Sequence, residues 1–100
     1  MLSTVTYAET ASFYGKGSHG KRTANGEVFN QYAATCASNK YKMGTKLKVT
    51  NKANGKSTVC RVNDTGGFGK YGRSLDMSKG SFSKIANPSV GLIKVKIIKL

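Results

Sequence analysis

Few side chains in this sequence can take part in acid–base chemistry. The 100 residues hold four carboxylates and one histidine: Glu9, Glu27, Asp64, Asp76 and His19. In Leu75-Asp76-Met77 the apolar neighbours would face inward from a strand, which leaves Asp76 on the outer surface, close to the start of a helix. Such a carboxyl can transfer a proton; the competing interpretation is that Asp76 caps the helix or braces a loop.

Asp64 follows a stretch in which polar and apolar residues alternate, and it precedes a glycine-rich loop. An aspartate at the end of a strand often bonds its own backbone in a turn, which is the structural alternative to a role in chemistry. His19 stands between glycines, in Gly17-Ser18-His19-Gly20, so we expect it to be exposed, either as a solvated loop residue or as a substrate contact.

The two cysteines, Cys36 and Cys60, allow one pairing. Neither belongs to a CxxC motif, and one histidine cannot complete a zinc site, so neither a metal nor another cofactor is expected. They are either two reduced core thiols or one disulfide. A disulfide would stabilise the domain by about 3 kcal/mol and would suit a small domain outside the cell, which is the interpretation we favour.

Seventeen Lys and Arg against four acids give a net charge of +13. Any single lysine is best interpreted as solvated surface, but the total favours a polyanionic environment: nucleic acid, an anionic membrane or acidic wall polymers. No nucleic-acid-binding signature is present, and no apolar run approaches the roughly 20 residues of a transmembrane helix. Met1–Thr10 lacks a secretion signal. We therefore expect a mature segment carrying a start Met, or a phage-type protein delivered by another route.

The periodicity predicts one mainly β domain with a single short helix, a closed barrel in preference to a sandwich. Asn54-Gly55 predicts a type I′ hairpin turn, and Ser78 is a candidate N-cap. Strands are expected at 8–14, 32–37, 45–50, 57–63, 74–77 and 91–100, and the helix at 78–86.

An ordered set of short motifs resembles the rare lipoprotein A family. The motifs are Ala11–Gly15, His19–Glu27, Gly44-Thr45, Val49–Asn51, Asn54–Lys56, Val62–Asp64 and Leu75–Ser78. The resemblance implies a six-stranded double-psi β-barrel over residues 11–100, with residues 1–10 as an extension or a lead-in to the first strand. It implies a monomer outside the cytoplasm, in the periplasm or the wall, that acts on peptidoglycan or another anionic wall polysaccharide. The reaction implied is lytic transglycosylation, which leaves a 1,6-anhydro product.

The resemblance also implies roles for individual residues. Asp76 matches, by position, the acid that expansins and membrane-bound lytic transglycosylase A use. Asp64 would line the same groove as its partner, and Glu27 matches a glutamate of the catalytic members. His19 and Asn63 are expected to contact the substrate. Independently of the resemblance, Phe68 and Tyr71 lie in the glycine-rich loop, where aromatic side chains can stack on sugar rings and a core role is less expected.

Two positions depart from the family's pattern. Asn30 stands where catalytic members carry Asp, and Ser38 stands where they carry His. Neither residue transfers protons readily, which favours the alternative function, an expansin-like wall-binding module without turnover. Whether the glycan must be stripped of its peptides stays open.

Overall fold

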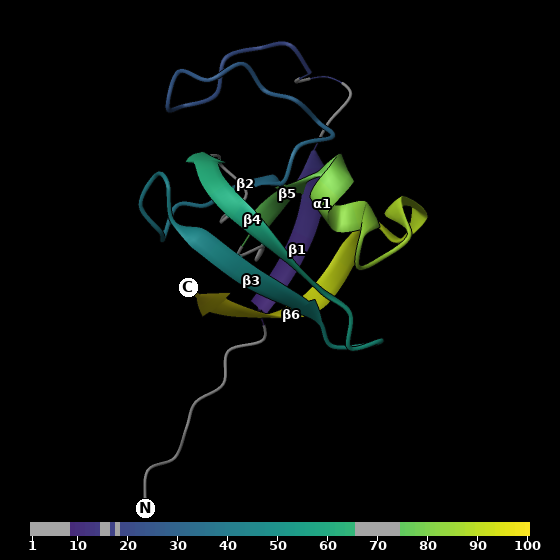
Figure 1. Ribbon diagram of the computed structural model, residues 1–100. Helices are drawn as coiled ribbons and strands as arrows, with labels where there is room; N and C mark the ends of the chain where they lie inside the picture. The colour runs from purple at the N-terminus through teal and green to yellow at the C-terminus, as the bar shows by residue number, and fades with distance from the viewer. Residues whose placement is uncertain (1–8, 15–16, 18, 66–74) are drawn as a thin grey trace, which may run out of the picture.

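The computed structural model describes residues 9–14, 17, 19–65 and 75–100 of the chain, and it contains one barrel (Figure 1). The short helix α1 follows β5 directly, and the 3-10 turn η2 precedes β6. The strands are β1 (Glu9–Tyr14), β2 (Thr35–Ala37), β3 (Lys46–Asn51), β4 (Ser57–Asp64), β5 (Leu75–Ser78) and β6 (Leu92–Lys99); the helical elements are α1 (Lys79–Ser83) and η2 (Pro88–Val90).

The barrel closes in the order β1-β5-β2-β4-β3-β6. β1 pairs with β5 and β2 pairs with β4 in parallel, while the other neighbouring strands are antiparallel. β6 closes the barrel because one of its edges pairs with β1 and the other with β3. This order confirms the predicted mainly β, six-stranded barrel with one short helix.

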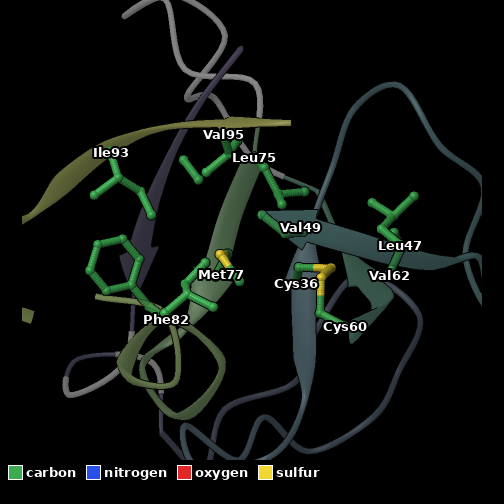
Figure 2. Packing of buried hydrophobic residues seen from close by; sticks show 12 residues of the cluster. Cys36, Leu47, Val49, Cys60, Val62, Leu75, Met77, Phe82, Ile93 and Val95 are labelled. Atoms are coloured by element: carbon green, nitrogen blue, oxygen red, sulfur yellow. A yellow bond between two sulfur atoms is a disulfide. The ribbon is translucent and has the colours of Figure 1, made fainter. Parts of the chain in front are cut away.

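The core consists of the inward-facing alternate residues of the strands together with Phe82 of α1 and Ile85 (Figure 2). Burying these aliphatic side chains is the main stabilising contribution, at about 25 cal/mol per Å² of apolar surface. In the middle of the cluster Cys36 and Cys60 form a disulfide, and both are fully buried. The bond links β2 to its neighbour β4, so the oxidised alternative for the two cysteines is the one present.

Helix α1 covers one end of the core. Ser78 is its N-cap, as predicted, and its side chain accepts a hydrogen bond from the Ser81 backbone. Phe82 is fully buried and lies 4.9 Å from the Phe13 ring, measured between centroids. Gly80 lies so close to the backbone of Tyr32 that a Cβ atom there would be 2.5 Å from the Tyr32 carbonyl oxygen. This contact fixes the segment before β2 against the helix.

Three local predictions were wrong in detail. The strand predicted from residue 32 begins only at Thr35, because the segment before it turns, with the Ala33 backbone donating to Asn30. The helix ends at Ser83 instead of residue 86. The hairpin between β3 and β4 is present, but its turn is not type I′: Gly55 has a φ of 73°, and no non-glycine residue in the described part has a positive φ.

Asn54 has a different function in that turn. Its side chain donates to the Ile85 carbonyl at 2.9 Å and accepts from the Lys56 backbone at 2.9 Å. This tertiary contact holds the turn without the left-handed backbone that the dipeptide suggested. In the part of the chain that the structure describes, no helix has the length and apolar character needed to span a membrane.

Candidate functional site

The two candidate aspartates lie in one row of residues across the outside of the barrel. Ala37 of β2 is the register partner of Asp76 on one side and of Asp64 on the other. Ser12 of β1 is the next residue in the row, and its hydroxyl donates to Asp76 Oδ1 at 2.7 Å. Two strand spacings of about 4.8 Å put the Cα atoms of the two aspartates roughly 10 Å apart.

The orientation of this row follows from the alternation of the strands. Leu75 and Met77 are fully buried inside the barrel, so Asp76 between them faces outward and is half-buried, as predicted. The register of the β2–β4 pair shifts: Cys36 of β2 lies opposite Val62 of β4, but the next residue, Ala37, lies opposite Asp64. This bulge re-aims the strand end so that Asp64 shares the outer face with Asp76.

Asp64 is held by three hydrogen-bond donors. Its Oδ1 accepts from the backbone of Ala24 at 2.9 Å and of Thr65 at 2.9 Å, and its Oδ2 accepts from the Tyr14 hydroxyl at 3.3 Å. The Thr65 contact is the expected turn bond, but the other two join the carboxylate to segments far away in sequence. Asp64 therefore ties the end of β4 to β1 and to the turn that contains Ala24.

Tyr14 lies within electrostatic reach of both aspartates. Its ring stacks on the buried Phe29 with 4.5 Å between centroids and 15° between planes. Burial, followed by the nearby charge of Asp64, the hydrogen bond to Asp64 and the charge of Asp76, raises the pKa of the Tyr14 phenol well above its usual value. The phenol is thus a protonated donor that faces the acid pair.

Glu27 lies beside this row, and its carboxylate forms an ion pair with Arg61. Arg61 of β4 reaches it with two nitrogens, at 2.6 and 2.7 Å, and both side chains are partly exposed. The hydrogen bonds from Arg61 and then from Asn25 lower the pKa of Glu27 to about 2. Glu27 is therefore an ionised carboxylate at neutral pH, and it fastens the 23–27 turn to the barrel.

Four predicted site residues remain, namely His19, Asn63, Phe68 and Tyr71. His19 is exposed, as expected, and its Nδ1 accepts from the Gln31 backbone at 3.2 Å. Asn63 is 2% exposed, and its buried side-chain oxygen has no partner. Phe68 and Tyr71 lie outside the described residues.

Asn30 and Ser38, the two positions that depart from the family's pattern, brace local backbone. Asn30 accepts from the Tyr32 backbone at 2.9 Å. The buried Ser38 hydroxyl accepts from the backbones of Lys40 and Tyr41, both at 3.1 Å. Among the residues with described positions, no group of three or more His, Cys, Asp or Glu side chains could hold a metal ion.

Three residues of this site, Ser12, Tyr14 and Arg61, were not predicted from the sequence. The Tyr14 hydroxyl donates to Asp64, and because the inward-facing Ala11 and Phe13 alternate with Tyr14 on β1, the period of two places Ser12 and Tyr14 outward together. Arg61 was overlooked, although it is the one cation in the β4 sequence. The period of two indicates which side chains of a strand face outward. It does not indicate which residue each of them contacts.

A closed six-stranded barrel with parallel β1–β5 and β2–β4 pairs, and two aspartates on one outer face, defines a double-psi β-barrel with an acidic site. Residues 6–97 match the family described as "Lytic transglycolase". The chain belongs to that family.

Relatives and one solved structure agree with this membership. The chain is 49% identical over 87% of its length to the probable endolytic peptidoglycan transglycosylase RlpA of Synechocystis sp., and 46% identical over 95% to the endolytic peptidoglycan transglycosylase RlpA of Campylobacter jejuni. It spans only 27% and 36% of those proteins. An expansin of Clavibacter michiganensis, solved with cellohexaose, has the same fold: TM-score 0.69 and 18% identity, over 93% of this chain and 49% of that one.

Proposed function

We propose that this domain is a lytic transglycosylase that cleaves the glycan strands of peptidoglycan. The observation that carries the proposal is the arrangement of Asp76 and Asp64 on either side of Ala37, with the Tyr14 hydroxyl on Asp64. Two relatives bear the name of peptidoglycan transglycosylases, and the expansin with the same fold was solved with an oligosaccharide. Each of these facts supports a polysaccharide substrate.

The reaction needs one group that gives a proton and then takes one back. Asp76 protonates the oxygen that leaves the anomeric carbon of N-acetylmuramic acid, and the bond between that carbon and the oxygen breaks. The 6-hydroxyl of the same sugar attacks the anomeric carbon, and its proton returns to Asp76. The product is a 1,6-anhydro ring, and no water is consumed.

The neighbouring residues support this step without carrying the proton. Asp64, held by three donors, supplies a fixed negative charge close to the positive charge that develops on the sugar. Glu27 is a positioning residue: its ion pair with Arg61 holds the 23–27 turn, whose Ala24 backbone bonds Asp64. His19, exposed at the edge of the 19–34 segment, contacts the glycan, as do Phe68 and Tyr71. Asn63 is buried, and its side chain hydrogen-bonds Glu27, which is one of the causes of that carboxyl's lowered pKa.

Peptidoglycan defines the compartment that we propose. The substrate lies outside the cytoplasmic membrane, in the periplasm or the wall, and a buried disulfide is typical of proteins in such oxidising surroundings. The net charge of +13 attracts the domain to an anionic polymer. We propose that it acts there as a monomeric domain.

The test is incubation of the protein with purified peptidoglycan sacculi, followed by separation of the soluble fragments and mass analysis. Wild type is expected to release 1,6-anhydro muropeptides. Asp76→Asn should lower the rate by at least about 100-fold, the range of general acid catalysis. Glu9→Gln is the matched control, since it makes the same chemical change where the carboxylate bonds the Ile97 backbone. Equal product from Asp76→Asn and wild type would refute the assignment.

The second candidate function is wall binding without turnover. It is favoured by Asn30 and Ser38, which bond local backbone where catalytic relatives carry Asp and His. It predicts that the domain sediments with sacculi, that rising salt releases it, and that no soluble fragment appears. Release of anhydro fragments by wild type would exclude it.

A further inference from the structure

The outer face of β3 and β6 carries lysines and exposed aliphatic side chains together. Alternate residues of the two strands face outward, because the residues between them, such as Leu47 and Val95, are fully buried in the core. We call this surface the basic face. It consists of six exposed residues on β3, β6 and the neighbouring β4: Lys46, Lys48, Lys94, Lys96, Ile98 and Val59.

The strand register makes the basic face continuous. Lys48, in the middle of β3, is the register partner of Val59 on one side and of Ile98 on the other. These two aliphatic side chains are 42% and 41% exposed. Lys96 lies opposite Thr50, the next outward residue of β3. Neighbouring strands lie about 4.8 Å apart and alternate residues of one strand roughly 7 Å apart, so the groups form a two-dimensional array, which suits a planar charged surface.

The charge of the basic face is not neutralised by carboxylates of the described residues. β3 and β6 contain neither Asp nor Glu. On the neighbouring strand β1, Glu9 accepts a hydrogen bond from the Ile97 backbone at 3.1 Å. Glu27, beside β4, is paired with Arg61. Within the part of the chain that the structure describes, none of the four lysines forms an ion pair, so they can bind external anions without first losing an internal partner.

The basic face and the two aspartates lie on opposite sides of the barrel. In the closed order β1-β5-β2-β4-β3-β6, β3 is three strands away from β5 in either direction, and β6 is three strands away from β2 (Figure 1). β5 carries Asp76, and β2 carries Ala37, which lies between Asp76 and Asp64 in the register. A surface that binds the basic face would therefore leave the aspartates accessible.

We propose that the basic face docks on the headgroup surface of an anionic lipid bilayer, with Asp76 and Asp64 on the side that faces away from the lipid. The lysines bind the lipid phosphates, and Val59 and Ile98 enter the boundary between headgroups and acyl chains. A soluble polyanion matches the lysines alone, whereas a bilayer matches both the charge and the aliphatic groups. The inference does not depend on the proposed function, because docking is measured without a glycan.

The first test measures cosedimentation with two kinds of vesicle, phosphatidylcholine alone and equal parts of phosphatidylcholine and phosphatidylglycerol. Wild type is expected to bind only the anionic vesicles. Lys48→Gln/Lys96→Gln should lower the partition coefficient about 25-fold, because each lysine at an anionic surface contributes about fivefold. The matched control is Lys79→Gln/Lys84→Gln, which removes the same charge at exposed lysines on and next to α1. Its binding should stay close to that of wild type, since these lysines lie outside the contact.

Two results of this first test would overturn the inference. One is that wild type does not sediment with the anionic vesicles. The other is an equal loss in the two double variants, which would mean that net charge, and not the basic face, decides binding. The Tm of each variant is measured on the same samples, so that a loss of binding is assigned only to folded protein.

The second test separates a bilayer from a soluble polyanion. Val59→Thr/Ile98→Thr keeps every charge and should weaken vesicle binding about threefold, because the methyl groups that enter the lipid are lost. Binding to polyphosphate in the same buffer should not change in this variant. If the threonine variant binds vesicles as wild type does, and polyphosphate binding depends on Lys48 and Lys96 as strongly as vesicle binding, the face binds polymers and the inference is wrong.

The third test determines which face contacts the lipid. The chain contains no tryptophan, so a single introduced tryptophan is a specific fluorescent probe. Ile98→Trp places it on the basic face, and Tyr32→Trp places it at a 70% exposed position in the segment before β2. On anionic vesicles that contain brominated lipid, the fluorescence of Ile98→Trp should be quenched and that of Tyr32→Trp should not. Quenching of Tyr32→Trp, or none in Ile98→Trp, would overturn the inference whether or not the protein cleaves peptidoglycan.

Discussion

Replacing Tyr14 by Phe removes one oxygen atom and leaves the ring stacked on Phe29. The lost hydrogen bond to Asp64 is 3.3 Å long and partly buried. Hydrogen bonds to charged groups contribute about 1.5–3 kcal/mol, and this length puts it below that range, at about 1 kcal/mol. A loss of that size lowers the Tm of a 100-residue domain by roughly 4–8 °C.

The effect on activity follows from what remains around Asp64. The backbone donors of Ala24 and Thr65 still hold one oxygen, so the carboxylate keeps its place but loses the contact that aims the other oxygen. We expect kcat on sacculi to fall about tenfold with a smaller change in KM, as for a positioning residue. The assay is the release of anhydro fragments, with Tm measured on the same samples. Tyr32→Phe, which removes a hydroxyl from a side chain that is 70% exposed, is the matched control.

The pH dependence of the same variant provides an independent check. Because the pKa of Tyr14 is raised in the folded protein, its contribution to stability is present below pH 10 and is lost as pH rises further. The difference in unfolding free energy between wild type and Tyr14→Phe should therefore shrink above pH 10. If Tyr14→Phe behaves like Tyr32→Phe in Tm, kcat and alkaline stability, the hydroxyl does not position Asp64.

Three further outcomes are expected. Changing Cys36 and Cys60 together to Ala should lower the unfolding free energy, measured in urea, by about 3.5 kcal/mol, because the bond spans 24 residues; no shift in the midpoint would contradict this value. The pKa of Glu27 is lowered from 4.5 to about 2, so its ion pair stabilises the fold above pH 4.5 and this stability is lost as pH falls toward 2. In Glu27→Gln, the Tm measured by calorimetry should therefore fall less than in wild type over the same pH range. Gly80→Ala should destabilise by about 1–3 kcal/mol because its Cβ would meet backbone, whereas Gly17→Ala, with open space, should be neutral; equal Tm values would refute the close contact.

The strands were predictable where one face is buried and the other is wet. The alternation around Leu47 and Val49 marks β3, and that around Ile93 and Val95 marks β6. Such a period identifies the inward residues, but it does not identify the neighbouring strand, because pairing is decided by contacts across the whole chain. The periodicity by itself therefore supplied neither the parallel pairs nor the closure order of the barrel.

The same limit applies to the site. The outward position of Asp76 followed from its two apolar neighbours. The ion pair of Arg61 with Glu27 joins residues 34 positions apart, and the contact of Tyr14 with Asp64 joins residues 50 apart. No local pattern encodes these distances. The turn at Asn54 shows the converse, since its side chain bonds to Ile85 and so overrides a strong local signal.

The position of β6 governs when the chain can fold. This last strand holds both β1 and β3, and its register joins Glu9 to Val95. Nearly the whole polypeptide must therefore be present before the first strand gains an antiparallel neighbour. Contacts between such distant residues make assembly slow. A nascent chain that ends before β6 would leave β1 with only its parallel neighbour, β5, and the barrel open between β1 and β3.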